Sequence, residues 1–290
     1  MVRLSYLGVI LIWSTTPLAI QWSGQGVGFL FGVASRMVIG GILSLALVML
    51  LRLPMAWHSK AKQTYLAAGL SIYGAMMCVY WSAQFVPSGW ISVLFGLTPI
   101  MTGLLAVRFL GEGKMTAVKL SGMLLGVAGL GVIFHTSSSF SSTAWYGVAG
   151  LLLAVALHSV GTVWVKRTGY QAHGLVITAG GLLVAVPLYL LTWVLTGASW
   201  PGSIPLKTGV AIIYLGVIAT VLGFAMFFYV LREVDATRVA LLTLITPVLS
   251  LYLGHILNNE AVTMPLVLGA GMVLSGLALY EWGERKITGT

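Results

Sequence analysis

Two ionisable side chains lie deep within long apolar stretches of this sequence and are the groups best suited to bind a polar solute. Arg36 lies eight residues after Gly28, where its apolar stretch begins, which is about 12 Å along a helix. His158 lies near the middle of the apolar stretch 144–165. A guanidinium binds a carboxylate through paired N–H donors. An imidazole hydrogen-bonds a solute or carries a proton near neutral pH.

Each of these residues also has a structural interpretation. An arginine at membrane depth costs roughly 2.5 to 3.5 kcal/mol on insertion scales, so it must face the protein interior or a wet cavity. Arg36 could instead bond free backbone carbonyls or extend toward the membrane surface. The imidazole of His158 could be neutral and bonded to a neighbouring helix. The sequence leaves both alternatives open.

Polar and aromatic side chains with helical spacing accompany these two residues. The series Tyr73, Met77, Tyr80 and Gln84 falls at i, i+4, i+7 and i+11, on one face of a helix. Buried hydroxyl and amide groups need partners, which a cavity supplies. Candidates from other predicted helices complete the predicted substrate-binding set, which is Trp13, Thr16, Arg36, Tyr73, Met77, Tyr80, Gln84, Thr98, His158 and Tyr214. Such a lining suits an amphipathic or aromatic metabolite, although tryptophans and tyrosines near helix ends also form interfacial belts.

The acidic residues, histidines and cysteine exclude several chemistries. All six carboxylates fall at the ends of apolar stretches or in loops, so coupling through a carboxylate at the bilayer midplane is not expected. No two histidines have metal-ligand spacing, and Cys78 is the single cysteine, so we expect neither a metal nor a cofactor. No nucleophile elbow, zinc-protease motif or aspartate pair is present. An intramembrane enzyme and a channel are therefore the less favoured alternatives to a carrier.

Composition places the chain in a membrane. Of its 290 residues 59% are hydrophobic and 7% charged, and its mean hydropathy is +1.01, whereas soluble domains carry about 25% charged residues. A spanning helix needs about 20 apolar residues, so we predict an all-α fold of ten transmembrane helices. The predicted spans are Leu4–Gln21, Gly28–Leu51, Thr64–Phe85, Trp90–Phe109, Thr116–Phe134, Ala144–Val165, Ala172–Thr196, Lys207–Leu231, Arg238–Leu257 and Ala261–Trp282.

Basic residues orient these spans. If the N-terminus is cytoplasmic, thirteen lysines and arginines fall in inside segments and only Lys207 falls outside. The positive-inside rule then places both termini in the cytoplasm. The net charge of +9 is accounted for by this asymmetry, and we expect the bilayer, not nucleic acid, as the partner.

The two halves of the chain share a repeated pattern. Residues 81–133 align without gaps on residues 229–281, and Thr98-Pro99 and Glu112 then match Thr246-Pro247 and Glu260. Five predicted spans separate equivalent positions, so the copies must point in opposite directions. We therefore predict repeats at 1–136 and 144–284 with a linker at 137–143. Pro99 and Pro247 would form a pair of bends, because a helical proline cannot donate to the carbonyl four residues earlier.

These features resemble the drug/metabolite transporter superfamily, specifically its EamA-type exporters. The similarity lies in Trp13-Ser14 of the first span, Ala34-Ser35-Arg36 of the second, and Thr98-Pro99 with Gly111-Glu112. The resemblance implies an inner-membrane exporter of amino acids or related metabolites that works by alternating access, either as a monomer or as a homodimer. His158 departs from the family pattern, where an aromatic or small residue is common. The substrate therefore cannot be carried over from the family.

Overall fold

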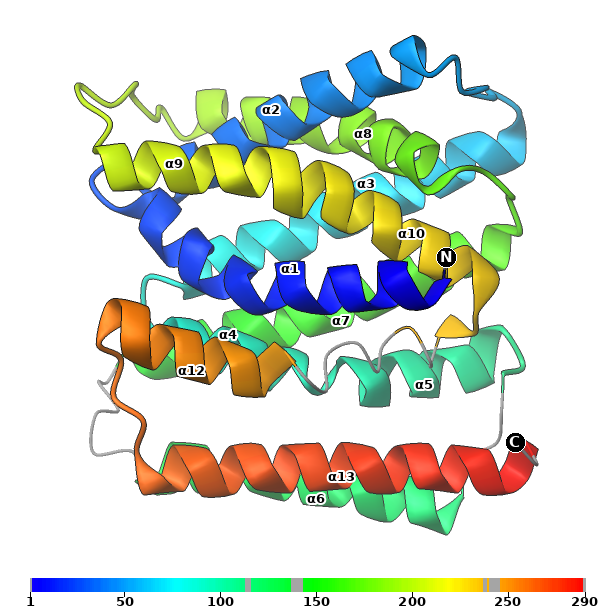
Figure 1. Cartoon of the computed structure of the whole chain (residues 1–290), viewed down its shortest axis with the longest axis vertical. Coiled ribbons are helices and arrows are strands. Elements are labelled where there is room, and N and C mark those ends of the chain that lie inside the picture. Colours follow the sequence, from blue (N-terminus) through cyan, green and yellow to red (C-terminus); the bar gives the residue numbers. More distant parts are fainter. Residues whose placement is uncertain (1, 113–115, 137–142, 237–238, 240–245, 289–290) are drawn as a thin grey trace.

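The computed structural model describes residues 2–112, 116–136, 143–236, 239 and 246–288, and the regular structure within them is helical, without strands (Figure 1). The helices are, in order, α1 (Val2–Gly24), α2 (Phe29–Leu50), α3 (Ser59–Ser82), α4 (Ser88–Phe95), α5 (Thr98–Phe109), α6 (Ala117–Thr136), α7 (Ala144–Thr168), α8 (Gly174–Leu195), α9 (Leu206–Tyr214), the π-helix η1 (Leu215–Leu222), α10 (Gly223–Glu233), α12 (Thr246–Asn258) and α13 (Met264–Thr288). The expected all-helical fold is confirmed. The predicted linker 137–143 and the first part of the predicted ninth span lie largely outside the described residues.

Long helices that expose large apolar side chains make up most of the fold. Six segments of the described chain are long and apolar enough to cross a membrane: α1, α2, α4 with α5, α7, α8, and α9 through α10. Shorter apolar stretches occur in α6 and α13. Large apolar side chains such as Leu11, Ile42, Leu191 and Leu268 are exposed on these helices, where hydrocarbon would surround them. The chain is therefore a multi-pass membrane protein.

The predicted span Trp90–Phe109 is interrupted. α4 ends at Phe95 and α5 begins at Thr98, with Gly96 and Leu97 between them. Pro99 explains the break, because it lacks an N–H and is tolerated only in the first turn of a helix. α12 likewise begins with Thr246-Pro247. Both prolines thus lie where a helix begins, 148 residues apart.

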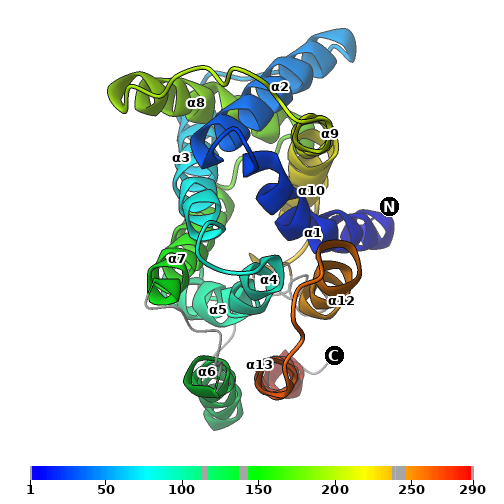
Figure 2. The ribbon, with the colours of Figure 1, turned by 90° about the vertical axis from the view of Figure 1, so that its left-hand side faces the viewer.

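The helices pack around α1 and α3. α3 lies between α7 and α8, while α1 contacts α2, α4, α9, α10 and α12. Viewed along the bundle, α6 and α13 lie side by side beyond the other helices (Figure 2). Their close crossing needs glycine, because a Cβ added at Gly122 would lie 2.3 Å from the Gly276 carbonyl oxygen. The beginning of α1 and the end of α13 lie at the same end of the bundle (Figure 1).

Candidate functional site

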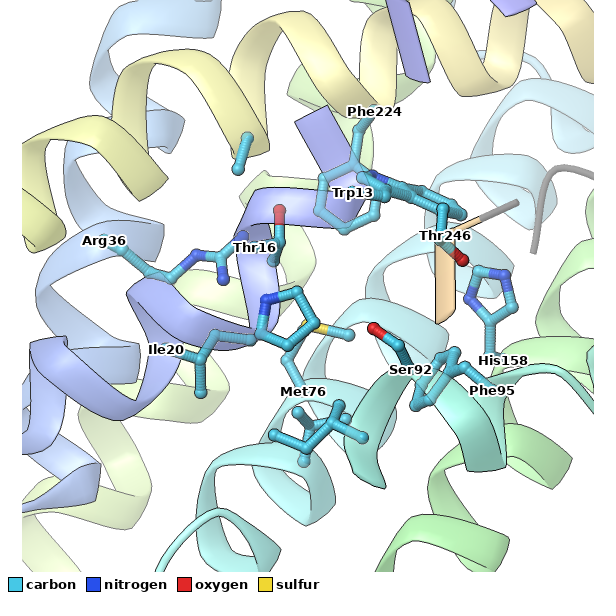
Figure 3. Close-up of a pocket in the computed structure, with 14 residues that line it drawn as sticks. Trp13, Thr16, Ile20, Arg36, Met76, Ser92, Phe95, His158, Phe224 and Thr246 are labelled. Atoms are coloured by element: carbon cyan, nitrogen blue, oxygen red, sulfur yellow. The ribbon is translucent and has the colours of Figure 1, made fainter. Parts of the chain in front are cut away.

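A cavity lies inside the bundle, walled by α1, α2, α3, α4, α7, α12 and the segment η1–α10 (Figure 3). About 70 Å³ of it is open to the centres of water molecules, and one water needs roughly 10–15 Å³ on that measure. The space therefore holds a few waters or a small solute. Its lining is mostly apolar and consists of Trp13, Thr16, Pro17, Ile20, Arg36, Met76, Val79, Ile91, Ser92, Phe95, His158, Ala219, Phe224 and Thr246.

α1 supplies four of these residues, and Pro17 shapes the helix there. Pro17 lies inside α1 and cannot donate to the carbonyl of Trp13, so that oxygen lacks its usual helical partner. The Thr16 hydroxyl donates to the Ile12 carbonyl oxygen at 2.7 Å. The donor of Thr16 is therefore used within the helix, and its oxygen remains free to accept a hydrogen bond from a solute.

Among the described residues of the lining, Arg36 of α2 is the one charged side chain, and it is only 1% exposed. Its Nε and Nη2 atoms each donate to the Thr220 hydroxyl at 3.1 Å, and Nη1 donates to the Tyr80 hydroxyl at 3.4 Å. The guanidinium also lies 5.8 Å from the centre of the Tyr80 ring. Among the described residues no carboxylate forms an ion pair with Arg36. A buried cation without an anion is costly, so this position favours an anionic ligand.

His158 of α7 faces the cavity from the side opposite Arg36 (Figure 3). Its ring lies 5.9 Å from that of Trp13, 5.4 Å from that of Phe227 and 6.1 Å from that of Phe95. No described residue hydrogen-bonds its ring nitrogens. The imidazole is therefore fixed by aromatic packing, and its nitrogens are available to a solute.

Two further spaces adjoin the cavity, one larger than it and one smaller. A vestibule with about 260 Å³ open to water centres shares Ile20 with the cavity and is also lined by Tyr80 and Gln84. A space of about 10 Å³ shares Met76, His158 and Phe224 with it. Ile20 thus lies between the cavity and the vestibule, and Met76, His158 and Phe224 lie between the cavity and the space of about 10 Å³.

Comparison with known proteins assigns the family. The sequence profile of the EamA-like transporter family matches residues 3–135 and again residues 145–282. The chain belongs to the EamA-like transporter family. The two matched segments together cover most of the chain, and each begins one residue after the start of a long apolar helix, α1 for the first and α7 for the second.

Relatives of this EamA-like chain are named as transporters. An uncharacterised transporter of Archaeoglobus fulgidus is 26% identical over 92% of this chain and 94% of its own length. The uncharacterised transporter YoaV of Bacillus subtilis is 24% identical over 99% of both chains. A probable amino-acid metabolite efflux pump of Escherichia coli is 25% identical over 69% of both. One crystal structure superposes with a TM-score of 0.73 at 21% identity, covering 98% of each chain, which supports the fold.

The EamA-like chain brings four of the predicted site residues to one cavity. Trp13, Thr16, Arg36 and His158 line it. Tyr80 contacts the cavity indirectly through Arg36. The role of these residues in binding remains a prediction.

The other predicted residues lie elsewhere. The Tyr73 hydroxyl pairs with the Thr192 hydroxyl at 2.7 Å, against α8. Gln84 is exposed in the vestibule, and Met77 is half-buried outside the cavity lining. The Thr98 hydroxyl is buried without a hydrogen-bond partner among the described residues. The Tyr214 hydroxyl bonds that of Thr15 on α1.

Several lining residues were not among the substrate-binding residues predicted from the sequence. Pro17, Ser92, Thr246 and Met76 belong to the lining, and Thr220 holds Arg36. Thr246 had a signal, since it matches Thr98 in the repeat. The only sequence feature that could have pointed to Thr220 is its hydroxyl group within an apolar stretch.

Proposed function

We propose that this protein exports a small organic metabolite, an amino acid or a related amphipathic or aromatic carboxylate, across the inner (plasma) membrane. Arg36 carries the proposal, because it is a buried cation in the cavity lining with no carboxylate partner among the described residues. A substrate carboxylate would supply the missing anion. The aromatic side chains Trp13, Phe95 and Phe224 would hold an apolar body.

We further propose that transport proceeds by alternating access between two inverted five-helix repeats, residues 1–136 and 144–284, with ten spans and cytoplasmic termini. Three observations support this scheme. The family profile matches the chain twice. α5 and α12 begin with the same Thr-Pro pair. The ends of the chain lie on one side of the bundle, as an even number of crossings requires (Figure 1). In this scheme Pro99 and Pro247 act as hinges at the cavity.

Names of relatives support the direction and substrate class. Relatives from Escherichia coli and Streptantibioticus cattleyicolor are named as a probable amino-acid metabolite efflux pump and a probable terminal-alkyne amino-acid exporter. We transfer only the general class, small carboxylate-bearing metabolites, to this chain.

Flux measurements in proteoliposomes test the proposal. Vesicles are loaded with phenylalanine, 3-phenylpropionate, 3-phenylpropanamide or phenethylamine, which differ in whether they carry a carboxylate and an amine. We expect saturable efflux of the carboxylates, unchanged chemically, and its loss in Arg36→Gln. Gel filtration and thermal unfolding check that this variant folds. Flux that does not saturate would favour a channel, and conversion of the solute would favour an enzyme. Equal flux of acid and amide would contradict the carboxylate site.

A further inference from the structure

We propose that Thr220, presented by the π-helix η1, is a positioning residue that fixes the Arg36 guanidinium for carboxylate binding. The inference rests on the proposed role of Arg36. Thr220 is fully buried and does not line the cavity itself. Its one hydroxyl oxygen accepts hydrogen bonds from two nitrogens of Arg36, Nε and Nη2, both at 3.1 Å. Rotation of the guanidinium about the Cδ–Nε bond would break both contacts, because it turns the Nε–H and Nη2 donors away from the hydroxyl oxygen.

The hydrogen bonds of Nε and Nη2 to Thr220 determine which part of the Arg36 guanidinium is left to face a ligand. Nε and Nη2 form the edge with which arginine binds a carboxylate side-on, and here Thr220 occupies it. The remaining donors lie on Nη1 and the outer side of Nη2. Tyr80 receives only a long bond of 3.4 Å from Nη1. The end of the guanidinium formed by Nη1 and Nη2 therefore points toward the cavity, where Figure 3 shows the Arg36 side chain entering it.

Two glycines let η1 approach α2 closely enough for this contact. A Cβ added at Gly40, one helical turn from Arg36, would lie 2.5 Å from Cγ2 of Thr220. A Cβ added at Gly216, four residues before Thr220, would lie 2.8 Å from Cγ2 of Ile39 and 3.2 Å from the Arg36 carbonyl oxygen. Glycine at both positions thus brings the backbones together at the level of Arg36.

The π-helix places Thr220 within this contact. Helices with i→i+5 hydrogen bonds are rare and occur frequently at functional sites. η1 spans Leu215–Leu222 and contains both Thr220, which bonds Arg36, and Ala219, which lines the cavity. Arg36 lies in the first matched segment of the family and Thr220 in the second. The hydrogen bonds between Arg36 and Thr220 therefore join the two matched segments directly at the cavity.

Binding of an acid and its neutral amide separates positioning from folding. Affinities of purified protein for 3-phenylpropionate and 3-phenylpropanamide are measured by isothermal titration. The affinity for the acid divided by the affinity for the amide measures how well the guanidinium recognises a carboxylate. General destabilisation of the protein does not change this ratio. Because a hydrogen bond to a charged group contributes more than a neutral one, we expect Thr220→Val to lower the ratio about tenfold. Thr220→Ser restores the hydroxyl and should restore the ratio.

Thr102→Val is the matched control. Thr102 is equally buried, and its hydroxyl bonds Ser159 on another helix instead of Arg36. We expect it to lower the melting temperature without changing the ratio. An unchanged ratio in folded Thr220→Val, or an equal fall in Thr102→Val, would overturn the positioning role. A wild-type protein that binds neither compound, or both equally, would instead overturn the carboxylate site itself, and with it this inference.

Discussion

Glu112 and Glu260 make the same kind of contact at positions that are related by the repeat. The Glu260 carboxylate accepts hydrogen bonds from the backbone N–H of Ser88 at 3.1 Å and from its hydroxyl at 2.7 Å. The Glu112 carboxylate accepts from the backbone N–H of Ala236 at 3.0 Å. Ala236 follows Ser88 by 148 residues, as Glu260 follows Glu112. The segments after α5 and α12 lie at opposite ends of the bundle (Figure 1), as inversion requires.

Neutralising Glu260 should destabilise the protein. The carboxylate also accepts from Gly89 N–H and the Asn258 amide, so it satisfies donors at the beginning of α4, where the helix dipole favours an anion. Since Glu260 is half-buried, we expect Glu260→Gln to cost about 1 kcal/mol and to lower the melting temperature. Glu112→Gln should act in the same direction.

Glu233→Gln serves as the control for that measurement. Within the part of the chain that the structure describes, Glu233 pairs only with its neighbour Arg232 at the surface, where an ion pair contributes little. A melting temperature of Glu260→Gln equal to that of Glu233→Gln would show that the Ser88 contact does not stabilise the fold.

The sequence could place Arg36 and His158 in the cavity wall because polar groups in an apolar stretch must face the interior. Helical spacing is less informative about partners. It groups Tyr73 with Tyr80, yet Tyr73 meets Thr192 of α8 while Tyr80 meets Arg36 of α2. Periodicity defines a face of a helix but not which neighbour covers it.

Non-local geometry accounts for the rest. Thr98 and Thr246 are equivalent in the sequence, but only Thr246 lines the cavity, because the two parts of the chain are packed differently around it. Thr220 reaches Arg36 through a π-helix and two close glycine contacts. Neither the i→i+5 pattern nor the approach of α2 to η1 has a signature in local composition.

Adding a methyl group at Gly40 should disturb the contact between α2 and η1. The new Cβ would meet Thr220 Cγ2 at 2.5 Å, and overpacking of this kind costs about 1–3 kcal/mol. We expect Gly40→Ala to lower both the melting temperature and the affinity for 3-phenylpropionate. Gly271→Ala, where a Cβ meets nothing within 4 Å, should leave both unchanged or raise stability slightly. Equal behaviour of the two variants would show that α2 and η1 can separate without consequence.

The ring nitrogens of His158 can be tested apart from its packing. His158→Phe keeps a ring among Trp13, Phe95 and Phe227, and replacements of similar volume cost less than about 1.5 kcal/mol. Because the variant loses both nitrogens, we expect transport of 3-phenylpropionate to fall about tenfold with little change in melting temperature. His158→Ala should reduce both, since it also leaves a void.

His255→Phe provides the comparison for His158. His255 is exposed, and among the described residues its ring hydrogen-bonds only the Glu260 backbone oxygen. Normal transport by both phenylalanine variants would mean that the His158 imidazole has a packing role alone.

Cysteine labelling tests the orientation of the helices in the membrane. In a Cys78→Ala background the chain has no thiol, so a single introduced cysteine reports one position. Ser59 is the first residue of α3, at the end of the bundle that holds both termini, and Ser199 follows α8 at the other end. Both serines are exposed. A membrane-impermeant maleimide added to intact cells should therefore label Ser199→Cys and label Ser59→Cys only after the membrane is permeabilised. Five predicted crossings separate the two sites: α3, α4 with α5, α6, α7 and α8. Because five is odd, labelling of both sites from the same side would contradict the proposed ten-span arrangement and the inversion of its halves.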